Sequence, residues 1–249
     1  EKKLSSKKPG ITEDPTSPHV ESTNLCSELL SKDTNLSSEL KAKYYIDELC
    51  TTHIKDLSNN NFIYKKLEDP KLKVKTEDKQ NGNSYTKLWG AMLTPAKTQA
   101  YYDMVKLQIT DPEKFKNQNF EYDEDIKIYD VLSKTSDSVI YRYKNVKYRG
   151  SNVFSVEYYG ITKFLNIKDN NLYIILNDLD QNKKDNGNVS FLKSFIIIYN
   201  NQDLKGTHVI FMTEQIAENE NNHNIAVEES INTFKADIKR TYNNSLKLE

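Results

Sequence analysis

The stretch IAVEESINTFKADIKRTYNNSL, residues 225–246, decides the fold that we predict for this chain. Its apolar side chains recur at helical spacing and form a single stripe, made of Val227, Ile231, Phe234, Ile238 and Tyr242. The charged side chains lie largely off this stripe, so we expect a long amphipathic helix over residues 224–246. Five or six strand-like runs precede it, and a sheet of such strands needs its inner face covered. Sheet and helix could meet as a solid core or could enclose a cavity.

The composition argues against two classes of function. The chain has 249 residues, enough for one large domain or two small ones, and its formal net charge is −1. Only three of its basic residues are arginine, the side chain best suited to read phosphates and guanines, so nucleic-acid binding is not expected. No run approaches the roughly 20 apolar residues of a membrane-spanning helix.

The cysteines leave open whether the chain contains a disulfide, and the histidines give no sign of a metal site. Cys26 and Cys50 are an even pair, which fits one disulfide in an oxidising compartment and fits two free thiols equally well. The histidines show no metal-ligand spacing, so no metal and no cofactor is expected; they are His19, His53, His208 and His223.

The chain divides into three parts by composition. Residues 1–20 carry Lys, Ser, Thr and three prolines with almost no apolar side chain, which is typical of a flexible leader. Residues 21–57 read as an N-terminal helical extension, and residues 58–249 read as the main domain.

The extension is expected to contain two helices. Residues 22–32 could form a short one, and the apolar spacing of residues 35–57 predicts a longer one. Cys26 and Cys50 would lie on these two helices. If the helices are antiparallel, a bridge between the cysteines is geometrically reasonable.

The main domain begins with strand-like segments. Residues 62–67 and 71–76 look like two short strands. The run KVKTEDKQNGNSYTKLWGAML, residues 73–93, predicts a hairpin that turns at Asn81-Gly82.

Two helix starts follow the hairpin, and a meander of strands follows them. Thr94-Pro95 and Asp111-Pro112 each combine a capping residue with a proline at the first helical position. From residue 126 onward short apolar runs alternate with turn residues, which predicts an antiparallel meander. Its strand candidates are 126–132, 138–145, 153–165, 171–179, 191–199 and 207–214.

This element order resembles a START domain, the helix-grip (START or Bet v 1-like) fold of lipid transfer proteins related to the steroidogenic acute regulatory protein. The resemblance is most specific over residues 88–145, where a strand, a Pro-initiated helix, a DPE helix and paired strands follow one another, and over residues 223–243. The RYKN run (142–145) and the ES-x-x-x-FK-x-x-I pattern (229–238) are similar to the exported START proteins of malaria parasites, the fam-a (Pyst-A) group. The resemblance covers about residues 35–246.

The resemblance implies an α+β fold in which a curved antiparallel sheet surrounds a long C-terminal helix and an elongated cavity. The cavity would hold one phospholipid or sterol, with phosphatidylcholine as the expected cargo of the parasite group. A non-enzymatic monomer would transfer this lipid between membranes through transient membrane contact. Secretion or export into the host cell is implied in the same way.

A lipid cavity needs an apolar lining, and the chain offers candidates for it. They are Trp89, Met92, Met104, Tyr141, Tyr143, Phe154, Phe211, Ile231, Phe234 and Ile238. Each could equally pack an ordinary core. Strand alternation puts Leu88 and Trp89 on opposite faces of the sheet without showing which one faces inward.

Arg142 and Glu157 are the candidate polar pair. They lie in apolar surroundings on consecutive predicted strands, so they could pair inside the barrel, near a cavity floor where START domains often have such a pair. Both could instead point outward into solvent.

Two other functions stay open. The same scaffold could act as an interaction module that binds a host protein, and a cavity filled completely by side chains would favour it. Catalysis is least expected, because the sequence contains no G-x-S-x-G, no phosphate loop and no metal spacing.

Overall fold

The computed structural model describes residues 21–32, 34, 36–79, 82–168, 171–183, 185, 187–202, 204–218 and 223–248. The leader expected over residues 1–20 and the turn residue Asn81 lie outside the described residues.

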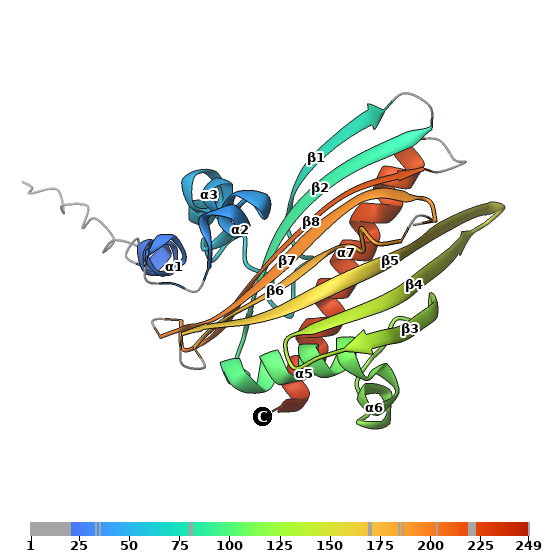
Figure 1. The fold of residues 1–249 in the computed structure, drawn as a ribbon. Helices are drawn as coiled ribbons and strands as arrows, with labels where there is room; N and C mark the ends of the chain where they lie inside the picture. The colour runs from blue at the N-terminus through green and yellow to red at the C-terminus, as the bar shows by residue number, and fades with distance from the viewer. Residues whose placement is uncertain are drawn as a thin grey trace, which may run out of the picture.

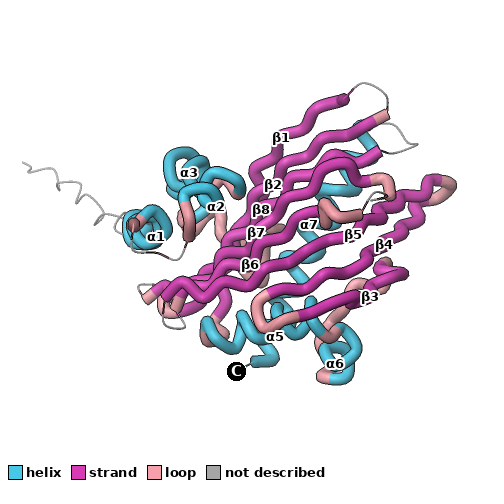
Figure 2. Tube along the Cα trace, viewed as in Figure 1, coloured by secondary structure: helices cyan, strands magenta, loops and turns pink. Residues whose placement is uncertain are grey.

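The described residues form one antiparallel sheet with helices on both of its faces (Figures 1 and 2). The strands are β1 (Leu72–Lys79), β2 (Asn83–Thr94), β3 (Ile126–Lys134), β4 (Ser138–Arg149), β5 (Asn152–Lys168), β6 (Leu172–Leu179), β7 (Val189–Asn201) and β8 (Gly206–Glu218). Their order across the sheet is β1-β2-β8-β7-β6-β5-β4-β3, so β3 to β8 form the predicted meander and β8 pairs with β2. The six strands predicted after residue 126 and the β1–β2 hairpin are confirmed.

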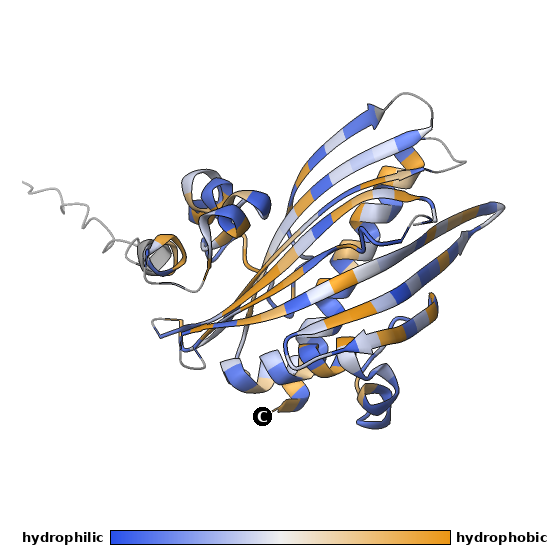
Figure 3. Ribbon diagram, in the orientation of Figure 1, coloured by the Kyte–Doolittle hydropathy of each residue, from blue (hydrophilic) through white to orange (hydrophobic). Residues whose placement is uncertain are grey.

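The central strands are apolar on both sides because both of their faces are covered. The runs LYIIL (172–176) and FIIIY (195–199) are almost continuously apolar in the sequence, and Figure 3 shows that the central strands are largely hydrophobic. Ile175 and Ile198 face the core on the inner side of the sheet, whereas Ile174 and Ile197 face the core on the outer side.

The inner side is covered by the helices that follow the β1–β2 hairpin and by the last helix. These are α5 (Thr98–Thr110), α6 (Pro112–Asn117) and α7 (His223–Ser245), which ends in a 3-10 turn (Leu246–Leu248). The helix predicted over residues 224–246 is therefore confirmed. It runs obliquely across the sheet, and α5 and α6 lie near its C-terminal end (Figure 1).

One of the two predicted helix starts is confirmed and the other is wrong. Asp111 caps α6 by accepting a hydrogen bond from the Lys114 backbone N–H at 3.0 Å, with Pro112 at the first helical position. Thr94, in contrast, is the last residue of β2, and its hydroxyl lies 2.6 Å from that of Ser245. Thr94 pairs with Thr207 of β8, which keeps it in the strand, and α5 begins only at Thr98.

The outer side is covered by the N-terminal helices α1 (Glu21–Leu30), α2 (Ser38–Lys43), α3 (Ile46–Glu48), a π-helical turn η1 (Leu49–His53) and α4 (Ile54–Leu57). The single helix predicted over residues 35–57 is wrong, because Tyr45 adopts a left-handed conformation (φ 59°) between α2 and α3. At this break between α2 and α3, the Tyr45 ring packs against β2. The centroid of the ring lies 3.6 Å from Lys87 Nζ, a cation–π contact with the sheet.

The strand predicted over residues 62–67 is also wrong. This segment consists of turns and makes one isolated bridge to the sheet, from Tyr64 to Met92. The edge of β2 is already occupied by β1 as far as Gly90, so only the end of β2 remains for Tyr64.

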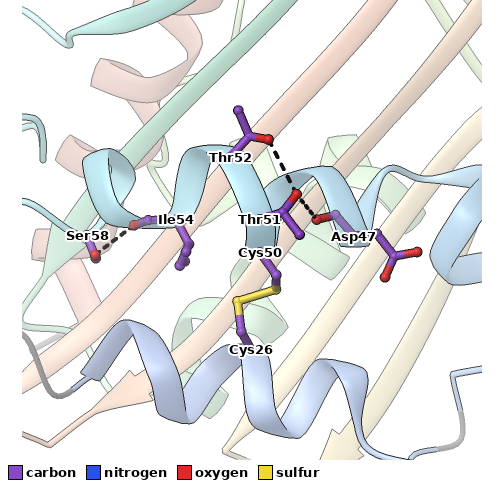
Figure 4. The surroundings of a disulfide bond; sticks show 7 residues. All are labelled: Cys26, Asp47, Cys50, Thr51, Thr52, Ile54 and Ser58. Atoms are coloured by element: carbon purple, nitrogen blue, oxygen red, sulfur yellow. Dashed lines mark hydrogen bonds between the residues drawn. A yellow bond between two sulfur atoms is a disulfide. The ribbon is translucent and has the colours of Figure 1, made fainter.

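A disulfide joins the two parts of the N-terminal helical layer. Cys26 of α1 and Cys50 of η1 are bonded, with their Cα atoms 5.6 Å apart (Figure 4). Of the two possibilities that the sequence left open, the structure has the bridge.

Candidate ligand-binding cavity

A cavity of about 730 Å³ lies between the inner face of the sheet and α7. Its wall includes residues from β2, from β4 to β8, and from α5 and α7. The volume is within the range of about 300–1,000 Å³ that is usual for small-molecule sites. Helix α7 therefore covers the sheet without filling the space beneath it.

One side of the wall is apolar. It is formed by Leu88, Leu192, Ile196 and Phe211 from the sheet, Val105 and Ile109 from α5, and Phe234 and Ile238 from α7. Helix α7 approaches the sheet closely at Gly90, where an added Cβ would lie 2.7 Å from the Ile238 side chain. The absence of a side chain at Gly90 thus sets the depth at which α7 packs.

Tyrosine rings from the neighbouring strands form a second part of the wall. The ring centroids of Tyr143 and Tyr158 are 5.0 Å apart, and those of Tyr129 and Tyr143 are 6.4 Å apart. Burial raises the pKa of all three hydroxyls well above the ordinary value, so the rings present neutral phenols.

Polar side chains gather in a third part of the wall, which we call the polar end. It consists of Asp123 from the α6–β3 loop, Asn145 and Lys147 from β4, and Thr233, Asp237 and Arg240 from α7.

Hydrogen bonds join its members, both between β4 and α7 and within α7. Lys147 Nζ donates to Thr233 Oγ1 at 2.9 Å, and Arg240 Nη1 lies 2.7 Å from Asp237 Oδ1. Asp237 is half-exposed by area, yet burial is the main cause of its raised pKa, with Arg240 partly offsetting the effect. Asp237 is also one of the residues that line the cavity.

The cavity approaches the surface between the β4–β5 hairpin and the first half of α7. Val153 of β5 lines the cavity and is 48 % exposed. Tyr148 of β4 and Ile225 of α7 are exposed apolar side chains on the same hairpin and on the same half of the helix. Arg149 Nε and Glu229 Oε1, 3.1 Å apart, join the hairpin to α7 at this edge. The rim therefore combines exposed apolar side chains with one ion pair.

Asn188 closes a gap in the cavity wall beyond the end of β6. Strand β6 pairs with β5 only from Gly160 to Lys168, so the first half of β5 has no strand neighbour on that side. The Asn188 amide takes the place of a strand there, accepting from the Glu157 N–H at 2.9 Å and donating to the Ser155 carbonyl at 2.6 Å.

The ten predicted lining residues fall into two sets. Five of them line the cavity: Tyr143, Phe154, Phe211, Phe234 and Ile238. Met92, Met104 and Tyr141 are buried in the inner core without reaching the cavity, and Ile231 lies on α7 without lining it. A role in ligand binding stays a prediction for each of them.

Trp89 does not line the cavity. It is 3 % exposed on the outer face of the sheet, where its ring lies 4.5 Å from that of His53 and 5.6 Å from that of Phe195. Leu88 is the inward-facing member of the pair, because the N-terminal helices cover the opposite face at Trp89.

Arg142 and Glu157 form an ion pair, with 2.7 Å between Nη2 and Oε1, but not inside the barrel. Their strand neighbours Tyr143 and Tyr158 face the cavity, so alternation puts the pair on the outer face. Lys144 joins the pair 2.9 Å from Glu157, and hydrogen bonds from both cations lower the pKa of that carboxyl group.

The sequence-based search missed the residues of the polar end. Alternation on β4 could have found Lys147, since it shares a face with Tyr141, Tyr143 and Asn145. Nothing comparable marked Asp237, because a charged residue beside the apolar stripe of a helix usually faces solvent.

The part of the chain that the structure describes contains neither a candidate metal site nor a candidate membrane-spanning helix. Within it, no group of three or more His, Cys, Asp and Glu side chains is positioned to hold a metal ion. None of the helices described has the length and apolarity that a membrane-spanning segment requires.

Comparison with known proteins shows a likeness in fold alone. Neither the protein-family models nor the curated protein sequences include a match to this chain. Among solved structures, human STARD10 superposes with a TM-score of 0.52 at 12% identity, over 88% of this chain and 84% of that one. Human StAR-related lipid transfer protein 5 gives 0.48 at 9% identity, over 84% and 97% of the two chains. The Zhui aromatase/cyclase from Streptomyces sp. R1128 gives 0.46 at 7% identity, over 66% and 94%.

The likeness to STARD10 confirms the predicted fold class. The chain has the α+β helix-grip fold of START domains, with an eight-stranded antiparallel sheet packed on a long C-terminal helix and short helices at the N-terminus.

Proposed function

We propose that this chain, which has a START-like fold, binds one lipid molecule in the cavity beneath α7 and transfers it between membranes. The observation that carries the proposal is the cavity of about 730 Å³, which has an apolar side and a polar end. Water opposes the exposure of an acyl chain by about 0.8 kcal/mol for each CH₂ group. The apolar side offsets this cost, and the polar end provides partners for a head group.

The rim of the cavity supports the transfer step. Tyr148, Val153 and Ile225 are exposed apolar side chains, and each could enter the interfacial region of a bilayer during transient contact. Among the described residues, the Arg149–Glu229 ion pair joins the β4–β5 hairpin to α7 at this rim, and opening it would widen the path to the cavity.

The finer expectations stay predictions that rest on the sequence resemblance. These are phosphatidylcholine as the cargo, a monomeric carrier without catalytic activity, export into a host cell, and likeness to the malaria-parasite group. The division into a leader, a helical extension and a main domain also stays a prediction, and it rests on the composition and the apolar spacing of the sequence.

Lipid binding is favoured over the alternative of a host-protein interaction module. A module of that kind has no need for an internal cavity, and a filled cavity would have supported it. The open cavity, with its apolar side turned inward, supports a small amphiphilic ligand instead.

The test is extraction of lipid from vesicles by delipidated protein. Phosphatidylcholine vesicles with a labelled lipid are incubated with wild-type protein and with two tryptophan variants. Ser194→Trp places a large ring in the cavity, whereas Ser133→Trp makes the same change at an exposed position of β3. We expect transfer by wild type and S133W, and its loss in S194W.

Native mass spectrometry of the purified protein extends the test to lipids not present in the vesicles. A wild-type protein that carries no lipid or sterol and extracts none would reject the proposal. Equal transfer by S194W and S133W would reject the cavity as the binding site.

A further inference from the structure

The polar end, taken together with Asp125, which pairs with Lys147, carries more negative than positive charge. Arg240 is shared by two carboxylates, with Asp237 at 2.7 Å and Asp123 at 3.7 Å. Lys147 has Asp125 as its ion-pair partner at 3.7 Å. Three carboxylates therefore meet two cations, and one negative charge is left in excess when all five groups are ionised.

Asp237 is the carboxylate that has free hydrogen-bond acceptor positions. Its Oδ1 lies 2.7 Å from the Arg240 guanidinium, while its Oδ2 has no hydrogen bond or ion pair with any residue that the structure describes. An ionised carboxylate has about four acceptor positions, so most of those of Asp237 are free. The side chain is 51 % accessible, and Asp237 is one of the residues that line the cavity.

The position of Asp237 on α7 links this charge to the apolar side of the cavity. Phe234 and Ile238, which line that side, are its neighbours at three positions before and one position after. A ligand group held at Asp237 would therefore have its chain directed along these two side chains and toward Phe211. Burial raises the pKa of the Asp237 carboxyl group, and a bound cation would favour its ionised form.

We propose that Asp237 binds the positively charged nitrogen of an amphiphile's head group, an inference that rests on the lipid-binding function proposed above. The excess negative charge selects a cation, and the free oxygen of Asp237 accepts its hydrogen bond or contacts its methyl groups. Two sources carry this chemistry: the choline or ethanolamine of a two-chain phospholipid, and the amine of a single-chain base.

The experiment measures which lipid the delipidated protein takes from mixed vesicles. One arm offers equal amounts of phosphatidylcholine and phosphatidic acid with the same acyl chains. Phosphatidic acid lacks the choline group and therefore carries a net negative charge. A second arm offers phosphatidylcholine vesicles that contain sphingosine. Bound lipid is extracted after repurification and quantified by mass spectrometry.

We expect wild-type protein to prefer phosphatidylcholine over phosphatidic acid by roughly ten-fold, which corresponds to about 1.4 kcal/mol of attraction between the Asp237 carboxylate and the quaternary nitrogen. Asp237→Asn keeps the shape of the side chain and removes its charge, so its preference should fall to near unity. Asp130→Asn is the matched control, because it removes the same charge from an exposed position of β3 opposite Arg142. Its preference should equal that of wild type.

The two arms separate the possible results. Enrichment of sphingosine over phosphatidylcholine assigns the site to a single-chain base, and the reverse assigns it to a phospholipid; both support the proposal if D237N abolishes the selection over phosphatidic acid. A wild-type preference for phosphatidic acid, no preference, or a preference unchanged in D237N would overturn it. Absence of any bound lipid in wild type would instead reject the lipid-binding function itself.

Discussion

At the scale of single residues, burial determines how His208 titrates. The imidazole is fully buried, and its Nδ1 lies against the Tyr199 hydroxyl. Desolvation lowers its pKa from the ordinary 6.5 to about 4. His208 is therefore neutral in the folded protein under conditions in which an exposed histidine would begin to take up a proton.

The pH dependence of stability follows from this difference. Between about pH 6.5 and about pH 4 the unfolded chain binds a proton at His208 and the folded chain does not, so acid favours unfolding. We expect the free energy of unfolding to fall by roughly 3 kcal/mol across this window. Denaturant unfolding at several pH values measures it.

His208→Gln is the comparison for this prediction, because glutamine can accept the Tyr199 hydrogen bond and does not titrate. The variant should be less stable at neutral pH but should lose much less stability on acidification. Parallel pH profiles for the two proteins would show that His208 is not the group responsible.

At the scale of elements, α7 is anchored at its C-terminal end. All four of its buried residues, Ile238, Tyr242, Asn244 and Ser245, lie in its last eight positions. The Asn244 amide accepts from the Glu121 N–H at 2.7 Å and donates to the Glu121 carbonyl at 2.8 Å, which ties the helix to the loop before β3. The first half of α7 crosses the cavity and has the partly exposed Arg149–Glu229 pair at the rim.

This asymmetry predicts that α7 opens from its N-terminal end. Amide hydrogen exchange should be faster in residues 223–232 than in residues 236–245, since local opening has a lower free energy where few side chains are buried. Exchange measured by mass spectrometry on peptides from the two halves tests this. Added lipid should slow exchange in the first half more than in the second. Uniform protection along α7 would contradict the expectation.

At the scale of the whole molecule, the sheet is covered on both faces by different parts of the chain. Helices α5 and α7 pack on the inner face around the cavity, and the N-terminal helices pack on the outer face around Trp89 and Phe195. The outer layer consists of short helices with few turns each, and helices of this length are only marginally stable without tertiary contacts. The Cys26–Cys50 disulfide constrains this layer.

Reduction of the disulfide is expected to lower the free energy of unfolding by about 3 kcal/mol. The bridge closes a sequence separation of 24 residues, and removing it restores the corresponding conformational entropy to the unfolded chain. Thermal unfolding with and without a reductant measures the change. A Cys26→Ala, Cys50→Ala double variant should match the reduced protein and should not respond to reductant. An unchanged melting temperature of the wild type on reduction would mean that the thiols are free in solution.

Local sequence patterns determined most of the elements. Alternation and turn residues located the strands after residue 126, the spacing of Ile231, Phe234 and Ile238 located α7, and Asp111-Pro112 located the start of α6. These features depend on side chains within a few positions of each other, because the helical and strand repeats are short.

Only the tertiary structure decided what faces the cavity. The same alternation that separates Leu88 from Trp89 fits either orientation, and the N-terminal helices decide between them by covering Trp89. Asp237 is charged and adjacent to an apolar stripe, so by sequence it resembles a solvent-facing residue until the sheet encloses the space in front of it. The identity of the inner face, the open volume and the unbalanced charge all depend on contacts between segments far apart in the chain, and short-range periodicity carries no information about such contacts.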